Sequence, residues 1–135
     1  MFNGMRKVSV YAPYDMRVHD APIPEVKDHE VRVRVRKSSI CGTDAKVYTG
    51  TYNFGYPRTP GHDSSGILDE VGEKVEQFSK GDRVVIDPIQ HCGKCSYCKT
   101  GRYNLCTEMR YMGMGAEGCL QEYVVVPEDR VLKLP

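Results

Sequence analysis

The chain has 135 residues, with 19 Lys and Arg against 18 Asp and Glu, so its formal net charge at pH 7 is +1. This balance argues against nucleic-acid or anionic membrane partners, because it provides no strong positive field. No apolar run approaches the roughly 18 residues of a spanning helix, and none follows the charges of residues 1–7 as in a signal peptide. We therefore expect a single-domain, cytoplasmic protein that binds neither nucleic acid nor membrane.

Short apolar or alternating runs, separated by turn residues, are the main structural signal along the chain. They predict strands at residues 8–11, 31–36, 67–71, 83–87, 120–126 and 131–134. Residues 20–24 hold two prolines and are expected to be extended or loop. Residues 44–48 are expected to form a short helical turn, and residues 51–66 a loop rich in Gly and Pro. This pattern favours an all-β sandwich or barrel with minor helix.

Residues 31–36 form the clearest predicted strand, with the sequence Val-Arg-Val-Arg-Val-Arg. A period of two places the valines on one face and the arginines on the other. The arginines suit either a stripe that binds nucleic acid or a solvated strand face. The near-neutral total charge favours the solvated face.

Four cysteines carry the strongest chemical signal. Cys92, Cys95, Cys98 and Cys106 follow the spacing C-x2-C-x2-C-x7-C. The short gaps let a tight turn aim neighbouring thiolates at one point, and Zn2+ binds four thiolates in closed tetrahedral sites. A ferredoxin-type cluster prefers a last gap of three residues followed by Pro, and disulfides belong mainly to oxidising compartments. We therefore predict a protruding lobe at residues 91–107, closed by one structural zinc.

A second and weaker constellation pairs Cys41 with His62. A thiolate and an imidazole suit Zn2+, and an open catalytic zinc site has three protein ligands. Asp63 is a candidate for the third ligand or for a hydrogen-bond partner outside the coordination sphere, and Asp44 is a candidate to orient the imidazole. By spacing alone, a small buried thiol and an unrelated loop histidine are the simpler interpretation.

The motifs around these residues resemble those of a known family. Residues 61–75 read G-H-D-x2-G-x5-G-x2-V, which closely resembles the signature of zinc-dependent medium-chain alcohol dehydrogenases. Cys41-Gly42-Thr43-Asp44 is similar to the first zinc-ligand segment of that family, and the four cysteines match its structural-zinc lobe. The resemblance runs over essentially the whole chain, with all motifs in family order. It implies that residues 1–135 form a GroES-like catalytic domain, a partly opened β-barrel with a protruding four-cysteine lobe.

The resemblance also implies a reaction and its cofactors. Zinc at Cys41 and His62, with Asp63 as the candidate third ligand, would polarise an alcohol. Thr43 would accept the alcohol proton, and hydride would pass to NAD or NADP. Nothing in the chain resembles the Rossmann domain that holds this nucleotide, because no G-x-G-x-x-G lies between a strand and a helix. We therefore expect the chain alone to be inactive.

The substrate class follows from the same resemblance. The segment that begins at Cys41 looks more like polyol, sugar-acid or threonine dehydrogenases than ethanol-type enzymes. This favours a small-molecule alcohol, and among such alcohols a polyol or sugar, as the substrate. The full-length protein is expected to be a homo-oligomer.

Three positions depart from the family pattern. Asp63 stands where the family usually has Glu, so the carboxylate sits one methylene shorter. Lys46 stands where many members have a proton-relay His, so the relay is expected to differ or to end in water. Cys119 replaces a large aromatic, and we expect a buried core thiol there rather than a metal ligand.

An alternative function is a zinc-stabilised binding module without catalysis, in which the lobe presents a surface to nucleic acid or protein. Its support is the basic cluster near the cysteines, Lys94, Lys99, Arg102 and Arg110. The near-neutral net charge and the ordered resemblance outside the lobe weigh against it. A salt-dependent DNA-binding assay would distinguish the two functions, because phosphate contacts give steep salt slopes.

Overall fold

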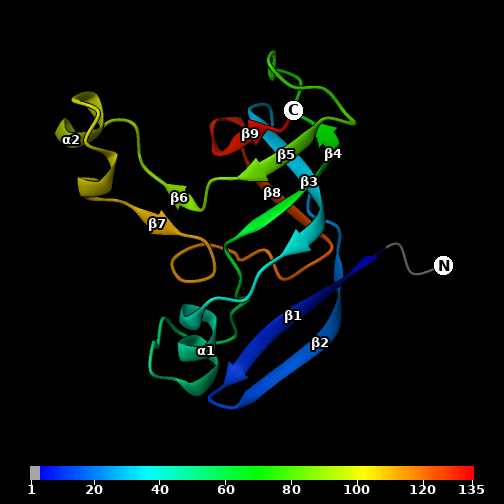
Figure 1. The fold of residues 1–135 in the computed structure, drawn as a ribbon, viewed down its shortest axis with the longest axis vertical. Coiled ribbons are helices and arrows are strands. Elements are labelled where there is room, and N and C mark those ends of the chain that lie inside the picture. Colours follow the sequence, from blue (N-terminus) through cyan, green and yellow to red (C-terminus); the bar gives the residue numbers. More distant parts are fainter. Residues whose placement is uncertain (1–3) are drawn as a thin grey trace.

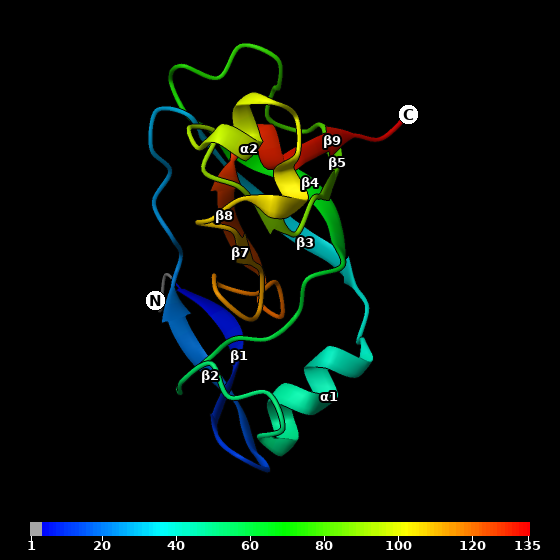
Figure 2. The same ribbon diagram turned by 90° about the vertical axis from the view of Figure 1, so that its left-hand side faces the viewer.

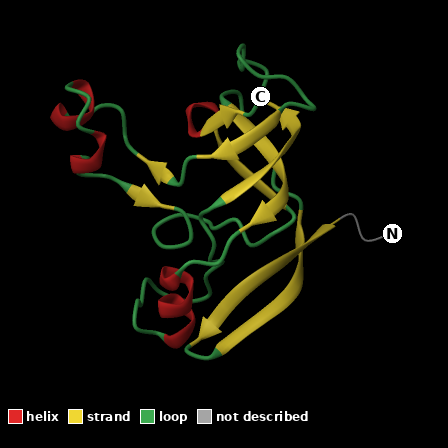
Figure 3. Ribbon diagram, viewed as in Figure 1, coloured by secondary structure: helices red, strands yellow, loops and turns green. Residues whose placement is uncertain are grey.

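The computed structural model describes residues 4–135. Residues 1–3, the start of the segment that was predicted not to be a signal peptide, lie outside the described range. At its centre is an antiparallel five-stranded sheet that curls into an open half-barrel (Figure 1; Figure 3). In sheet order its strands are β8 (Tyr123–Pro127), β3 (Glu30–Ser38), β4 (Ser64–Val71), β5 (Arg83–Ile86) and β9 (Val131–Lys133). The prediction of an all-β barrel with little helix is confirmed.

The core forms on one face of this sheet, where the strands place alternate apolar side chains. Val31 and Val33 of β3 are fully buried and pack with residues of every other strand in the sheet. Each fully buried valine or leucine contributes about 1.5–3 kcal/mol. Cys119 is also fully buried in this cluster, which confirms that it is a core thiol.

Irregularities in β3 bend the sheet and change the surroundings of one arginine. The register against β4 shifts between Arg32 and Val33 and again between Val35 and Lys37, and such bulges bend a strand. Arg34 is exposed as predicted. The side chain of Arg32 is only 15% exposed, because at the bulge its guanidinium lies 2.6 Å from carboxylate oxygens of both Asp69 and Glu70. The prediction of a solvated face is therefore wrong for Arg32.

Helix α1 (Gly42–Thr49) follows β3 and begins two residues before the predicted turn. Cys41 is its N-cap, and Gly50 ends it in the left-handed conformation. The loop that follows is shorter than predicted, because β4 already begins at Ser64. Gly66 lies inside β4, where a Cβ would come within 2.2 Å of the Arg34 carbonyl oxygen, so this glycine allows close strand pairing. Among residues 4–135, none of the helices combines the length and the apolar character that a membrane span requires.

A two-stranded hairpin lies apart from the sheet, beside α1 (Figure 2). Strand β1 (Gly4–Ala12) contains the predicted strand at residues 8–11, whereas β2 (Asp15–Pro22) was not predicted as a strand. Most β2 side chains are at least partly exposed and show no apolar alternation, so its sequence carries no strand signal. Pairing with β1 forms the strand instead, from Gly4 opposite Pro22 to the turn at Tyr14, which has φ 65°.

The segment before β8 joins the hairpin to the sheet. A strand was predicted from residue 120, but β8 begins at Tyr123. Leu120 instead accepts a backbone hydrogen bond from Val8 at 2.9 Å. The Glu122 amide donates to Arg6 at 3.1 Å, while the Glu122 carbonyl accepts from Val35 at 2.9 Å. Residues 120–122 therefore form backbone hydrogen bonds to both β1 and β3, rather than extending β8 along β3 alone.

The predicted lobe protrudes from the barrel on a short two-stranded stalk, β6 (Ile89–Gln90) and β7 (Arg110–Tyr111) (Figure 1). Its tip holds α2 (Ser96–Lys99) and the 3-10 helix η1 (Tyr103–Leu105). The 3-10 helix η2 (Glu128–Arg130) anchors it to the barrel. The largely buried Arg130 side chain donates to the Ile89 carbonyl at 2.7 Å and lies 2.9 Å from His91 Nε2. His91 in turn stacks on Tyr103, with ring centroids 4.2 Å apart.

Candidate metal centres

The lobe brings all four predicted cysteines together. Cys92 follows β6, Cys95 caps α2, Cys98 lies within α2 and Cys106 ends η1. Their sulfur atoms all lie within 4.8 Å of one another, and the Cys92 and Cys98 sulfurs are 3.9 Å apart. A zinc tetrahedron with Zn–S bonds of ~2.3 Å has edges of about 3.8 Å. All six cysteines of the chain are free thiols, so the spacing does not reflect disulfides.

Backbone amides of the lobe point at these sulfurs and favour the thiolate form that zinc requires. The amides of Cys92, Cys95 and Cys98 donate to the sulfurs of Cys106, Cys92 and Cys95 at 3.3, 3.4 and 3.5 Å. The Cys98 amide, and after it that of Thr107, lowers the pKa of the Cys95 thiol to about 6. Burial raises the pKa of Cys98 to about 12, so a cation is needed to hold that sulfur as a thiolate. The four residues fit a structural zinc.

The second constellation is held together by Asp44, a buried residue of α1. One oxygen of its carboxylate accepts the Cys41 amide at 2.8 Å, and the other accepts the Gly61 amide at 2.9 Å. The carboxylate thus fixes the backbone at Cys41 next to that preceding His62. The predicted contact between Asp44 and the imidazole is 3.8 Å long, beyond a hydrogen bond. Asp44 therefore acts through the backbone more than through the ring.

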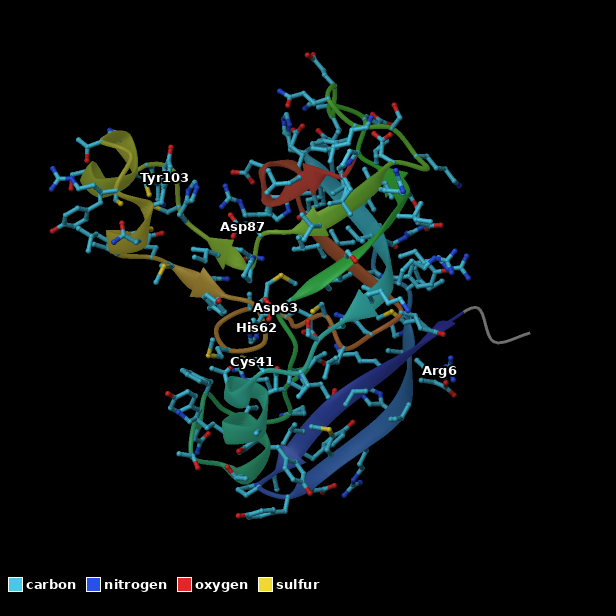
Figure 4. The ribbon with its side chains drawn as sticks, in the orientation of Figure 1. Arg6, Cys41, His62, Asp63, Asp87 and Tyr103 are labelled. Carbon is cyan, nitrogen blue, oxygen red and sulfur yellow. The ribbon has the colours of Figure 1, made fainter. Side chains whose placement is uncertain are left out.

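Figure 4 shows Cys41, His62 and Asp63 next to one another, between the barrel and α1. The imidazole of His62 is buried, and its Nε2 lies 3.5 Å from an oxygen of Asp63, whose side chain is 54% exposed. Within residues 4–135, only the four lobe cysteines gather three or more ligand atoms within 4.8 Å. The assignment of Asp63 as a third ligand therefore stays a prediction.

Thr43 lies in the first turn of α1, and its hydroxyl oxygen is buried without a hydrogen-bond partner among residues 4–135. Its backbone amide is the main cause of a lowered pKa at Cys41, and its hydroxyl, which is close enough to act on the sulfur, is the next. The lowered pKa favours a thiolate at Cys41, which is the form that binds zinc. An unpartnered buried hydroxyl beside a thiolate suits a site that receives a further polar group.

Sequence reasoning missed one residue of this site, Tyr111 in β7. Its ring packs edge-on against His62, with centroids 5.5 Å apart and planes at 63°. Burial raises the pKa of Tyr111, and the charges of Asp63, Cys41 and Asp87 raise it further. No sequence motif marks Tyr111, because only the return of the lobe stalk to the barrel places it beside His62.

Lys46 lies one helical turn after Thr43 on α1. Its ammonium nitrogen is 3.4 Å from the Tyr52 hydroxyl and 4.9 Å from the centre of the Tyr52 ring. Both side chains are exposed to solvent. That the relay past Thr43 differs at Lys46 or ends in water stays a prediction.

Comparison with known proteins identifies the family. Residues 27–135 match the profile of the alcohol dehydrogenase GroES-like domain. The chain belongs to this family. It is 44% identical over 122 residues to an L-threonine 3-dehydrogenase of Anaeromyxobacter sp. strain Fw109-5, covering 87% of this chain and 36% of the relative. It is 43% identical over 126 residues to a sorbitol dehydrogenase of Bombyx mori, covering 90% and 36%.

A solved structure shows the same GroES-like fold. The crystal structure of the alcohol dehydrogenase RspB of Escherichia coli CFT073, complexed with NADH, has a TM-score of 0.92 and 38% identity to the chain. The match covers 98% of this chain and 39% of RspB. The predicted family and the partly opened GroES-like barrel are therefore confirmed. The chain spans well under half the length of these relatives, so a GroES-like domain accounts for only part of such a protein.

Proposed function

We propose that the full-length protein containing this GroES-like domain is a zinc-dependent oxidoreductase that interconverts an alcohol and a carbonyl with NAD or NADP. Residues 1–135 form its catalytic domain in this proposal, residues 91–107 hold the structural zinc, and the nucleotide-binding domain lies elsewhere. The relatives support this, since they are named as threonine and sorbitol dehydrogenases and the RspB structure holds NADH. We propose a small polyol or sugar as substrate, and a homo-oligomeric, cytoplasmic enzyme.

The residues of the second constellation fit a catalytic zinc. Cys41 offers a sulfur whose pKa is lowered, His62 offers a buried imidazole, and Asp63 is the candidate third ligand or a partner of His62. When bound, zinc supplies Lewis acidity that lowers the pKa of the substrate alcohol. The chain's own part is to fix these side chains, which Asp44 does by tying the two backbone segments together.

The buried hydroxyl of Thr43 is the observation that carries the proposal. A buried hydroxyl without a partner costs about 1–3 kcal/mol. This one is close to the Cys41 sulfur but forms no hydrogen bond of ordinary geometry among residues 4–135. A substrate alcohol would satisfy it, donate its proton to Thr43 Oγ1 and remain oriented by that hydrogen bond. As Thr43 takes this proton it would release its own hydroxyl proton, which in this proposal ends in water.

Kinetics of the zinc-loaded full-length protein test this role. Thr43→Val should lower kcat about 10²- to 10⁴-fold, the usual contribution of a positioned proton acceptor. Thr43→Ser keeps the hydroxyl and should retain most activity, and both variants should keep the zinc content of the wild type. A Thr43→Val enzyme as active as Thr43→Ser would show that the hydroxyl takes no part in the reaction.

A further inference from the structure

Tyr111 is held firmly at the edge of the proposed catalytic site. It pairs with Ile89 in the lobe stalk, and the next residue, Met112, is fully buried and donates its amide to the Pro88 carbonyl at 3.1 Å. The pairing with Ile89 and the hydrogen bond of Met112 therefore fix the backbone that carries the Tyr111 ring. The ring itself rests edge-on against His62, with centroids 5.5 Å apart.

The phenol of Tyr111 has an unused capacity for hydrogen bonds. It forms none with any residue in the described range 4–135, although the ring is partly buried. A nearby contrast is Tyr56, whose phenol donates to the Val47 carbonyl at 3.2 Å. A phenol has one donor and can also accept. The Tyr111 phenol is therefore free to bind a ligand group beside His62, against which its ring packs.

The charges around the phenol restrict what that group is. The groups that act on it are Asp63, Cys41 and Asp87, all of which are acidic. Cys41 and Asp63 are proposed zinc ligands, so a bound zinc would offset their charge. Asp87 is the remaining acidic neighbour, and it disfavours a phosphate or carboxylate at the phenol. A neutral hydroxyl is tolerated, and it both donates and accepts as the phenol does. The chemistry therefore favours a second alcohol group on the substrate.

We propose that Tyr111 is a specificity-determining residue that binds a second hydroxyl of the substrate, next to the reacting carbon, and so selects polyols over monohydric alcohols. The inference rests on the proposed function, because it assumes that the reacting alcohol binds between Thr43 and the zinc ligands. It differs from the role of Thr43, which handles the reacting oxygen itself. A site with a hydrogen-bond partner for each hydroxyl rejects the analogue that lacks one of them.

The test compares Tyr111→Phe with wild type in the zinc-loaded full-length enzyme, using a vicinal diol and the monohydric alcohol of the same chain length. The variant keeps the ring against His62 and loses only the hydroxyl. We expect KM for the diol to rise about five- to tenfold, the factor for one lost hydrogen bond. KM for the monohydric alcohol and the zinc content should stay as in wild type. Tyr14→Phe, which removes an exposed phenol of the hairpin turn, should change none of these values.

The possible outcomes separate the inference from the proposed function. An equal change in KM for the two alcohols, or no change for the diol, would overturn the role of Tyr111 while leaving alcohol oxidation intact. A loss of zinc in Tyr111→Phe would show a structural role and would likewise overturn it. Wild-type enzyme that turns over no alcohol with either nucleotide would overturn the proposed function itself, and the selection of polyols with it.

Discussion

Asp44 and Gly61 are joined by a buried hydrogen bond of 2.9 Å between a carboxylate oxygen and a backbone amide. The residues are 17 positions apart, one on α1 and the other in the loop before β4. The second oxygen of Asp44 accepts the Cys41 amide at 2.8 Å. One side chain thus sets the relative position of the two segments that carry Cys41 and His62. The geometry of the proposed catalytic site depends on this bridge, even though Asp44 need not touch the metal.

The first prediction concerns this bridge. Asp44→Asn keeps the shape of the side chain but replaces one acceptor oxygen by an NH2 group, which would face a backbone amide. We expect it to lower the free energy of unfolding by about 1.5–3 kcal/mol, the range for a hydrogen bond to a charged group. Urea denaturation should show a lower midpoint with an unchanged slope.

Asp28→Asn is the matched control for Asp44→Asn. Asp28 pairs with Lys74 at 2.6 Å, but both side chains are more than half exposed. Exposed pairs contribute about 0–1 kcal/mol, so this variant should be nearly as stable as wild type. Equal effects of the two substitutions would show that the bridge from Asp44 to Gly61 does not hold the site together.

The second prediction concerns the structural zinc. Cys106→Ser removes one of four thiolates, and because metal binding is coupled to folding of the lobe, we expect a lower melting temperature and less than one lobe zinc per chain. The strands of the barrel lie outside the lobe, so their circular dichroism should be largely kept. Thr107→Ser, an exposed neighbour, is the control. Full zinc content together with an unchanged melting temperature in Cys106→Ser would contradict the assignment.

The sequence was informative where a pattern lies within one segment. Residues 31–36 predict β3 because the alternation of valine and arginine is itself the signature of a half-buried strand. Strand β2 was missed because it has no such pattern and forms through its register with β1. The start of β8 was misplaced for a similar reason, since residues 120–122 bond to β1 and β3 at once. Contacts between segments far apart in the sequence therefore determined strand β2 and the start of β8, which local patterns did not predict.

The candidate sites likewise differ in how far local sequence patterns predict them. The lobe cysteines were predicted from spacing alone, because short gaps bring thiolates together within one local fold. Cys41 and His62 needed the family resemblance, since 21 positions separate them and a buried carboxylate brings their segments together. Tyr111 had no signal at all, because its place beside His62 depends on where the lobe stalk returns to the barrel.

The third prediction is a pH dependence at Glu122. The backbone amide of Arg6, and then its guanidinium, hold the pKa of the Glu122 carboxyl below its usual value. A carboxyl whose pKa is lower in the folded state stabilises the fold above its unfolded pKa of about 4.3 and loses this contribution as pH falls through the folded value. Glu122→Gln should therefore be less stable than wild type at neutral pH, and the difference should vanish in acid.

The size of this effect is limited by exposure. The side chains of Arg6 and Glu122 are 73% and 43% exposed, so the difference at neutral pH should stay below about 1 kcal/mol and shrink with added salt. Urea midpoints measured from neutral pH to below pH 4 would show it. Glu25→Gln, at an exposed position without an ion pair among residues 4–135, is the control. A difference between wild type and Glu122→Gln that grows as pH falls would reverse the predicted sign.

The fourth prediction is that the two proposed zinc ions differ in how firmly they are held. The lobe offers four sulfurs, of which Cys98 and Cys106 are buried, and closed sites of this kind release metal slowly. Cys41, His62 and Asp63 do not gather as tightly, and the carboxylate of Asp63 is more than half exposed. Water at such a site weakens each electrostatic contact to the metal.

During graded chelation, followed by atomic absorption, zinc should leave the second site first. Cys41→Ser should lack the early fraction and keep the late one, whereas Cys106→Ser should show the opposite. Loss of both ions at one chelator concentration would show that the second site is as closed as the lobe.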